Sequence, residues 1–239
     1  IYRALAGVAR PVFGRQVELP HPVFVSWQIH TLDRHAECVP VEFLHRDGGV
    51  SLCLYPIPQS RLDYARWVSD GCRHGDLANL AVCQQILDFK ERFKPKHRFD
   101  LGDVVNTAAF RHGAKGTADE TRPVDPDKIW AVTWFEQYEP THLAWGNHDW
   151  RLFNWMNHPS AIISHSAATV WNDLNKTLAK LKCQTRPYIL RKNWFELGGM
   201  YWGHGQFFNE TALRQHAEYL GGPCVMAHIH APQVAQGRT

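Results

Sequence analysis

The chain has 239 residues, which is enough for one catalytic domain with a substantial buried core. Its composition, 44% hydrophobic and 21% charged, is ordinary for a globular protein. The net charge of +3, with the histidines neutral, is too small to predict nucleic-acid binding by itself. No run of about 18 apolar residues predicts a membrane span, and no signal peptide is visible. We therefore expect a globular protein with no membrane association.

Six cysteines are scattered along the chain without a Cys-x-x-Cys pair. This pattern indicates reduced thiols, and we expect a cytoplasmic protein. The sequence also holds 15 histidines and 10 tryptophans. Excess histidine allows metal ligation, although a surface position is the simpler explanation for any one histidine. Tryptophan could stack on nucleic-acid bases, but core packing explains it more simply.

The first quarter of the chain carries weak signals. Val41 to Leu44 and Val50 to Tyr55 flank a Gly-containing segment, 45–49, and this arrangement predicts a β-hairpin. Two prolines, Pro56 and Pro58, then interrupt the pattern. We interpret residues 1–63 as a small N-terminal extension of unknown role and residues 64–239 as the main domain.

From residue 64 onward, predicted strands alternate with predicted helices, which indicates an α/β (α+β) fold. Apolar residues at helical spacing predict four helices, the first capped by Asp76 and the second opened by Asp125-Pro126. Their apolar faces contain Val82, Ile86, Phe89 and Phe93, then Trp130, Trp134 and Tyr138, then Val170, Leu174, Leu178 and Leu181, then Leu213, Ala217 and Leu220. The predicted strands cover 64–68, 98–101, 141–145, 200–202 and 224–227.

Each of these five strands is followed directly by a polar cluster. Ligand sites in α/β folds form at the carboxyl ends of strands, where loops converge. The clusters are Asp70-Gly71-Cys72-Arg73-His74, Gly102-Asp103, Gly146-Asn147-His148-Asp149, Gly203-His204 and His228-Ile229-His230. Taken alone, Gly102-Asp103 is explained as a turn. The paired imidazoles of His228 and His230 suit a metal better than a core, because burying both without partners is costly.

Taken together, the order Gly-Asp, Gly-Asn-His-Asp, Gly-His and His-x-His resembles the calcineurin-like metallophosphoesterase superfamily. The resemblance covers about residues 64–232, and the stretches 101–103, 110–114 and 146–151 look particularly similar to phage and prophage members. It implies a four-layer αββα sandwich with a catalytic domain at 64–239. Because few residues follow His230, we expect the strands that close the second sheet to be absent or supplied by the N-terminal extension.

The first motif departs from the Asp-x-His pattern of that superfamily, and it allows two registers. In one, Asp70 is the aspartate and Cys72 replaces the histidine. In the other, which we favour, Cys72 replaces the aspartate and His74 is the histidine, as in a similar run of the lariat debranching enzymes. A third interpretation is that Cys72 is a loop residue and the site lacks one ligand. A thiolate ligand would favour Zn or Fe over Mg or Ca.

The resemblance implies two divalent metal ions, such as Mn, Zn or Fe, with Asp103 shared between them. The first ion would be held by Cys72, His74, Asp103 and His230, and the second by Asp103, Asn147, His204 and His228. A hydroxide bridging the ions would attack phosphorus in line. His148 would stabilise or protonate the leaving oxygen, and Asp149 would either orient His148 or cap a helix. Arg151 and Arg111 are candidate phosphate contacts, although a solvated surface role explains either.

These roles predict a phosphodiesterase that acts on a nucleotide or nucleic acid. A phosphomonoesterase or protein phosphatase could use the same metals, and the loops between the motifs would decide between the two. A binding scaffold that keeps the fold without catalysis is the alternative from another class, and the altered first motif is its only support. A scaffold has no need of His148, so the sequence favours an enzyme.

Overall fold

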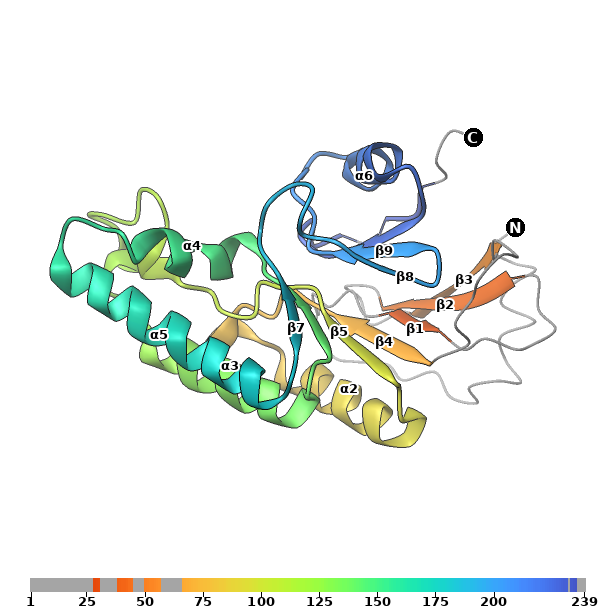
Figure 1. Cartoon of the computed structure of the whole chain (residues 1–239), viewed down its shortest axis with the longest axis horizontal. Coiled ribbons are helices and arrows are strands. Elements are labelled where there is room, and N and C mark those ends of the chain that lie inside the picture. Colours follow the sequence, from red (N-terminus) through yellow and green to blue (C-terminus); the bar gives the residue numbers. More distant parts are fainter. Residues whose placement is uncertain (1–27, 31–37, 45–49, 57–65, 232, 236–239) are drawn as a thin grey trace.

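The structure is a computed structural model that describes residues 28–30, 38–44, 50–56, 66–231 and 233–235, with side chains from residue 66 onward. The chain forms a mixed α/β fold in which five helices and two sheets can be described (Figure 1). Within the same ranges, none of the helices has both the length and the apolar character that crossing a membrane requires.

The larger sheet has seven strands in the order β3-β2-β1-β4-β5-β6-β7. Its parallel half comprises β4 (Trp67–Asp70), β5 (His97–Asp100), β6 (His142–Ala144) and, at the edge of the sheet, β7 (Gln184–Arg186). Their carboxyl ends therefore meet at one edge of the sheet. The strands predicted at 98–101 and 141–145 are confirmed within one or two residues, whereas β7 was missed because its three residues include no apolar residue.

The N-terminal strands extend this same sheet. β2 (Cys38–Leu44) and β3 (Val50–Pro56) form the predicted antiparallel hairpin, whose connecting segment lies outside the described residues. β1 (Gln28–His30) pairs with β2 on one side and with β4 on the other. The closing strands of the second sheet were expected to be absent or supplied by this region; its described strands do not supply them, because they extend the first sheet.

The smaller sheet has the order β10-β9-β8. It comprises β8 (Phe195–Leu197), β9 (Met200–Gly203) and β10 (Cys224–Met226), with β9 and β10 parallel. Helix α6 (Ala212–Leu220) connects these parallel strands. The strands predicted at 200–202 and 224–227 and the helix between them are confirmed.

The remaining helices are α2 (Leu80–Phe93), α3 (Asp125–Tyr138), α4 (Asn147–Trp155) and α5 (Ala161–Lys180). Helix α3 begins at the predicted Asp125-Pro126. Helix α2 begins later than predicted, because Asn79 and not Asp76 accepts the capping hydrogen bond from the Val82 amide, at 3.2 Å. Asp76 lies in a short 3-10 turn, Gly75–Leu77, and forms an ion pair with Arg122.

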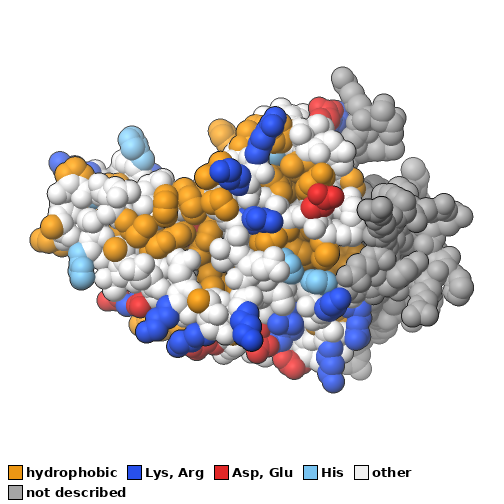
Figure 2. Space-filling view, viewed as in Figure 1, with side chains coloured by type: hydrophobic (Ala, Val, Ile, Leu, Met, Phe, Trp, Pro, Cys, Tyr) orange, Lys and Arg blue, Asp and Glu red, His pale blue; other side chains and the backbone are white. Residues whose placement is uncertain are grey.

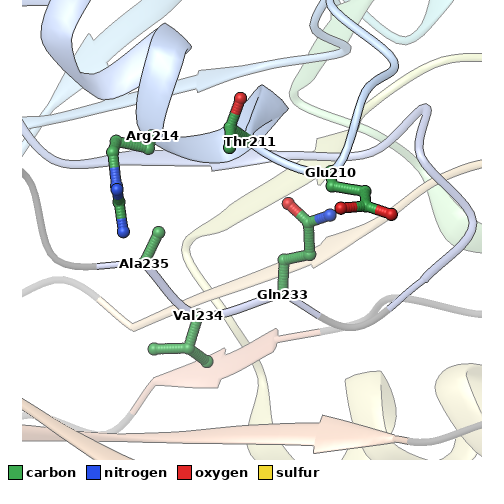
Figure 3. Close-up of a pocket in the computed structure, with 6 residues that line it drawn as sticks. All are labelled: Glu210, Thr211, Arg214, Gln233, Val234 and Ala235. Carbon is green, nitrogen blue, oxygen red and sulfur yellow. The ribbon is translucent and has the colours of Figure 1, made fainter.

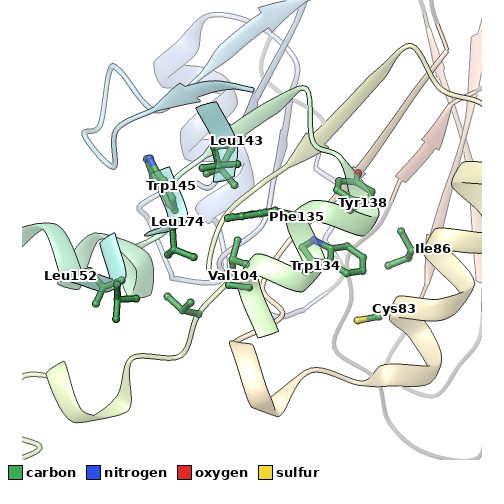
Figure 4. Packing of buried hydrophobic residues seen from close by; sticks show 14 of the residues in the cluster. Cys83, Ile86, Val104, Trp134, Phe135, Tyr138, Leu143, Trp145, Leu152 and Leu174 are labelled. Atoms are coloured by element: carbon green, nitrogen blue, oxygen red, sulfur yellow. The ribbon is translucent and has the colours of Figure 1, made fainter. Parts of the chain in front are cut away.

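Three apolar clusters hold these elements together. The largest joins the parallel strands to α2–α5 and includes Trp134, Phe135, Leu143 and Leu174 (Figure 4). A second lies between the two sheets and contains Phe99, Ala144, Phe195, Trp202 and Val225, with the Phe99 and Trp202 rings stacked at 4.6 Å. A third packs α6 on the smaller sheet through Ala212, Trp194 and Met226. Trp67 and Val68 of β4, like Leu143 and Ala144 of β6, are divided between the first two clusters, so both faces of these two strands are buried.

Helix α4 was not predicted, because its first turn reads as a polar motif. Its Trp150 and Phe153 rings stack at 4.4 Å, and both contact Trp171 of α5 edge-on. Hydrophobic side chains gather over α4 on the visible face (Figure 2). Phe153 of α4 is 38% exposed. The polar first turn of α4 is thereby fixed at the edge of the sheet where the parallel strands end.

Candidate metal centre

Four potential ligands from three separate segments converge beyond the ends of β4 and β5. One ligand atom each from Cys72, His74, Asp103 and His230 lies within 4.8 Å of the others. The two histidine Nε2 atoms are 2.9 Å apart, and the Asp103 carboxylate is 4.0 Å from His74 Nε2. This donor set of one sulfur, one carboxylate and two imidazoles is chemically suited to a divalent transition metal.

A second group shares the same carboxylate. His204 Nε2 lies 3.3 Å from Asp103 Oδ2, 3.1 Å from His228 Nδ1 and 3.2 Å from Asn147 Oδ1. The other ring nitrogen of His204, Nδ1, is 2.6 Å from the Leu101 carbonyl, which can only accept, so Nδ1 carries the proton. The Nε2 lone pair of neutral His204 then faces other lone-pair atoms. Such a convergence requires a proton or a cation, and it fits a metal ligand held by a backbone carbonyl.

The backbone at these residues is strained. Cys72, His74, Asp103, His228 and His230 all have φ between +48° and +73°. Of the other non-glycine residues with positive φ in the described chain, Lys94, Glu139 and Lys182 lie at helix C-termini, where this conformation is routine. Left-handed backbone costs on the order of 1–3 kcal/mol per non-glycine residue and persists at functional sites. Five such residues in one cluster indicate that ligand placement takes precedence over local backbone preference.

Two glycines allow the ligand loops to come together. A Cβ atom at Gly146 would collide with the Asp103 carboxylate, and one at Gly102 would collide with the backbone at Gly146. Gly102 also has φ of +85°. The glycines that precede Asp103 and Asn147 are therefore required by the close approach of the two loops.

The charge state of the second group is set by one buried carboxylate. Burial alone would raise the pKa of Asp103, but the neighbouring His204, His148 and His74 hold that pKa well below its usual range. For His204, burial alone would lower the pKa. The charge of Asp103 and the hydrogen bond to the Leu101 carbonyl outweigh burial, so the pKa of His204 is raised. Asp103 is therefore ionised in the structure.

Two outer histidines are held neutral. Burial lowers the pKa of His74 to about 3 and that of His228 to about 4. Neutral imidazole is the form that binds metals. Exposure differs across the site: Asp103 and His204 are buried, whereas His230 is exposed. A ligand could therefore approach from the His230 side.

The Cys72 thiol lies at the buried end of the first group. Burial, and then the charge of Asp103, raise its pKa well above the ordinary value, while the His228 amide, which donates to Sγ at 3.1 Å, lowers it. A thiolate at this position therefore needs a compensating cation, which a bound metal provides. The hydrogen bond also ties the β4 loop to the segment that carries His228 and His230.

No family model, curated protein or solved structure matches this chain. The structure brings together all seven predicted ligands, in the two groups that were expected, and Asp103 is common to both.

Asp70, the ligand of the alternative register, is directed elsewhere. Its carboxylate forms a buried ion pair with the Arg73 guanidinium, which also pairs with Asp100. Arg73 lies 4.4 Å above the Trp134 ring, and Trp134 Nε1 donates to Asp100. The geometry favours Cys72 and His74 as the first-motif ligands and makes Asp70 part of the support below them.

His148 lies at the rim of the site. Its Nδ1 donates to the Asn106 carbonyl at 2.8 Å, so Nε2 is the ring atom that faces the site, 4.0 Å from Asp103 Oδ2. Arg151 donates to the same Asn106 carbonyl at 3.1 Å and lies next to the His148 ring. Arg111 instead donates from Nε and Nη2 to the same oxygen, Oδ2 of Asp119. Arg151 is therefore the better placed of the two predicted phosphate contacts.

Of the two roles left open for Asp149, orienting His148 or capping a helix, the structure shows the cap. Its carboxylate is fully buried and accepts four backbone N–H groups, from Asp103, Val104, Val105 and Gly146, at 2.8–3.1 Å. The Asn106 carbonyl, and not Asp149, orients the His148 ring. Asp149 caps α4 and joins its first turn to the loop after β5, so it positions Asp103 and Asn147.

Sequence reasoning missed two aromatic residues beside the second group. The Tyr188 ring meets His204 edge-on at 5.7 Å, and the Phe208 ring meets His228 edge-on at 6.5 Å. Neither belongs to a motif. Burial, and then the Asp103 charge, raise the pKa of Tyr188, so its hydroxyl keeps its proton.

A separate pocket of about 300 Å³ lies between the start of α6 and the C-terminal segment (Figure 3). Its lining residues are Glu210, Thr211, Arg214, Gln233, Val234 and Ala235. These side chains include no histidine or cysteine, so this pocket does not carry the chemistry of the metal centre.

Proposed function

We propose that this chain is a binuclear metal-dependent phosphoesterase that hydrolyses phosphodiesters. The single observation that carries the proposal is the pair of ligand groups that share the Asp103 carboxylate. Bound there, two divalent cations such as Mn, Zn or Fe would polarise the phosphate ester and lower the pKa of a water molecule. The cations would be held by Cys72, His74, Asp103 and His230, and by Asp103, Asn147, His204 and His228.

The residues at the rim suit the leaving-group side of a phosphoryl transfer. His148 has Nδ1 committed to the Asn106 carbonyl, which leaves Nε2 to exchange a proton with a leaving oxygen. Arg151, held beside His148 by the same carbonyl, can bind a phosphate oxygen. Both side chains are half-buried and come from the first two turns of α4.

The fold and the motifs support placement in the calcineurin-like metallophosphoesterase superfamily, with αββα layering. The three apolar clusters lie where such layers would meet, between helices and sheet, between the two sheets, and between the small sheet and α6. The presence of His148 at the rim argues for catalysis and against a binding scaffold, because a scaffold needs only the fold.

The test starts from metal-free protein reconstituted with Mn, Zn or Fe(II), assayed on bis-p-nitrophenyl phosphate and on p-nitrophenyl phosphate. We expect diester hydrolysis that Cys72→Ala abolishes and Cys83→Ala preserves. Cys83 is the matched control, because it is also a buried cysteine but lies on α2 in the main core. Hydrolysis of the monoester alone would favour a phosphomonoesterase. Absence of metal binding and of turnover with every metal would refute the proposal.

The role of His148 has a sharper readout. Removing a general acid slows substrates with a poor leaving group more than those with a good one. We expect His148→Ala to reduce kcat about 100-fold or more for an alkyl phosphodiester and clearly less for a nitrophenyl ester. Equal losses for the two substrates would contradict proton donation by His148.

A further inference from the structure

The loop that follows His204 presents an exposed aromatic ring next to the candidate metal centre. Phe208 is 84% exposed, the highest value among the exposed large hydrophobic residues of the described chain. Its ring nevertheless stands 6.5 Å from the ring of His228, at an interplanar angle of 81°. The Phe208 side chain therefore combines near-complete exposure with a position at the second ligand group.

The backbone that leads to Phe208 is held in place. The amides of Gln206 and Phe207 both donate to Nε2 of the fully buried His216, at 2.9 and 3.1 Å. The Phe207 ring stacks on His216 at 4.4 Å and packs into the cluster below α6. The next residue, Phe208, therefore projects to the solvent from a fixed backbone, and its ring is preorganised for a binding partner.

Phe208 ends a row of four rings that crosses the second ligand group. Tyr188 contacts His204 at 5.7 Å, His204 contacts His228 at 4.9 Å, and His228 contacts Phe208 at 6.5 Å. The two central rings are proposed metal ligands, and Phe208 is the exposed end of the row. His148 and Arg151 lie on α4, which follows β6, whereas the row leaves the site through the loop after β9.

We propose that Phe208 is a stacking platform for a nucleobase, so that the substrate of this site is a nucleotide phosphodiester. The proposal rests on the proposed function, since a phosphate bound at the metal centre places the attached nucleoside beside the ligand loops. Every nucleobase presents a π-face, so stacking on a phenylalanine ring contributes affinity without demanding one sequence. A base stacked on Phe208 would bury this ring, which explains why so large an apolar side chain is exposed beside the site.

The experiment compares two diesters that share one leaving group, p-nitrophenyl thymidine 5′-phosphate and methyl p-nitrophenyl phosphate, on the metal-loaded full chain. The ratio of their kcat/KM values isolates the contribution of the nucleoside. We expect Phe208→Ala to reduce this ratio about 5- to 100-fold, the range for loss of one base-stacking contact. Phe208→Trp should retain the ratio, because it keeps an aromatic face.

The matched control is Ile162→Ala. Ile162 is 83% exposed, like Phe208, but it lies on α5. It should leave both kcat/KM values unchanged. A ratio that stays constant in Phe208→Ala would overturn the stacking proposal while leaving the phosphoesterase intact.

If the wild-type chain hydrolyses neither diester, the proposed function fails, and binding decides the stacking question. Calorimetry would then compare thymidine 5′-monophosphate with inorganic phosphate on the metal-loaded protein. Tighter binding of the nucleotide that disappears in Phe208→Ala would support the platform. Equal affinities for the two ligands would overturn it.

Discussion

Asp149 makes the most demanding structural prediction, because one buried carboxylate is the acceptor for four backbone N–H groups. Oδ1 accepts from Val104 and Val105, and Oδ2 accepts from Asp103 and Gly146. In Asp149→Asn, one of these oxygens becomes an NH2 group, which can only donate. Two backbone N–H groups then lose their acceptor in a fully buried position.

Each buried donor left without a partner costs about 1–3 kcal/mol, so Asp149→Asn should destabilise the protein by about 2–6 kcal/mol. The total stability of a domain is about 5–15 kcal/mol, so the effect is large. Urea unfolding followed by tryptophan fluorescence and circular dichroism would measure the change in the free energy of unfolding. Asp88→Asn is the control, because Asp88 is exposed and its carboxylate accepts a hydrogen bond from Gln84 one turn earlier on the same helix.

A free energy of unfolding for Asp149→Asn within about 0.5 kcal/mol of the Asp88→Asn value would refute this reasoning. It would mean that the two ligand loops are held by other contacts. The same variant tests the capping role of Asp149, since loss of stability together with loss of metal indicates positioning. Loss of activity with unchanged stability and metal content would instead restore a direct role next to His148.

Three further predictions concern other parts of the centre. Arg73→Met leaves two buried carboxylates unpaired and should lower the free energy of unfolding by about 3–5 kcal/mol; a neutral effect in urea titration would contradict the ion-pair network. Cobalt-loaded Cys72→Ser should lack the thiolate-to-cobalt charge-transfer absorption of the wild type, and an identical spectrum would remove Cys72 from the ligands. Burial lowers the pKa of His216 to about 4, below its unfolded value of 6.5. Its contribution to stability is therefore complete above pH 6.5 and is lost as the pH falls towards 4, by about 2 kcal/mol at pH 5. His216→Asn should flatten the difference between urea unfolding at pH 7 and pH 5, and an unchanged pH slope would disprove this assignment.

The sequence predicted those parts of the fold that depend on long, periodic patterns. Helix α3 begins at Asp125-Pro126 because proline is favoured in the first turn and the aspartates complement the helix dipole. Helix α4 was not predicted from the sequence, because Asn147, His148 and Asp149 occupy its first turn and look like a polar loop. Strand β7 contains no apolar residue, and β8 contains only two, Phe195 and Leu197, so neither shows the apolar pattern of a strand.

The candidate ligand set could be predicted because a polar cluster followed each of the five predicted strands, and parallel strands bring their ends together. The supporting contacts could not, because they depend on distant loops. Nothing in the sequence shows that Asp149 faces the backbone of Val104 and Val105, 44 or 45 residues away. The same holds for the loop after β9. The sequence shows neither the exposure of the Phe208 ring nor the two hydrogen bonds that the Gln206 and Phe207 amides donate to His216.

The most direct test of the binuclear metal centre is a crystal structure of the metal-loaded protein, with anomalous data collected at the absorption edge of the bound metal. Two anomalous peaks about 3.5–4 Å apart are expected. One should lie within coordination distance of Cys72, His74, Asp103 and His230, and the other of Asp103, Asn147, His204 and His228. A single peak, or peaks away from Asp103, would contradict the binuclear centre.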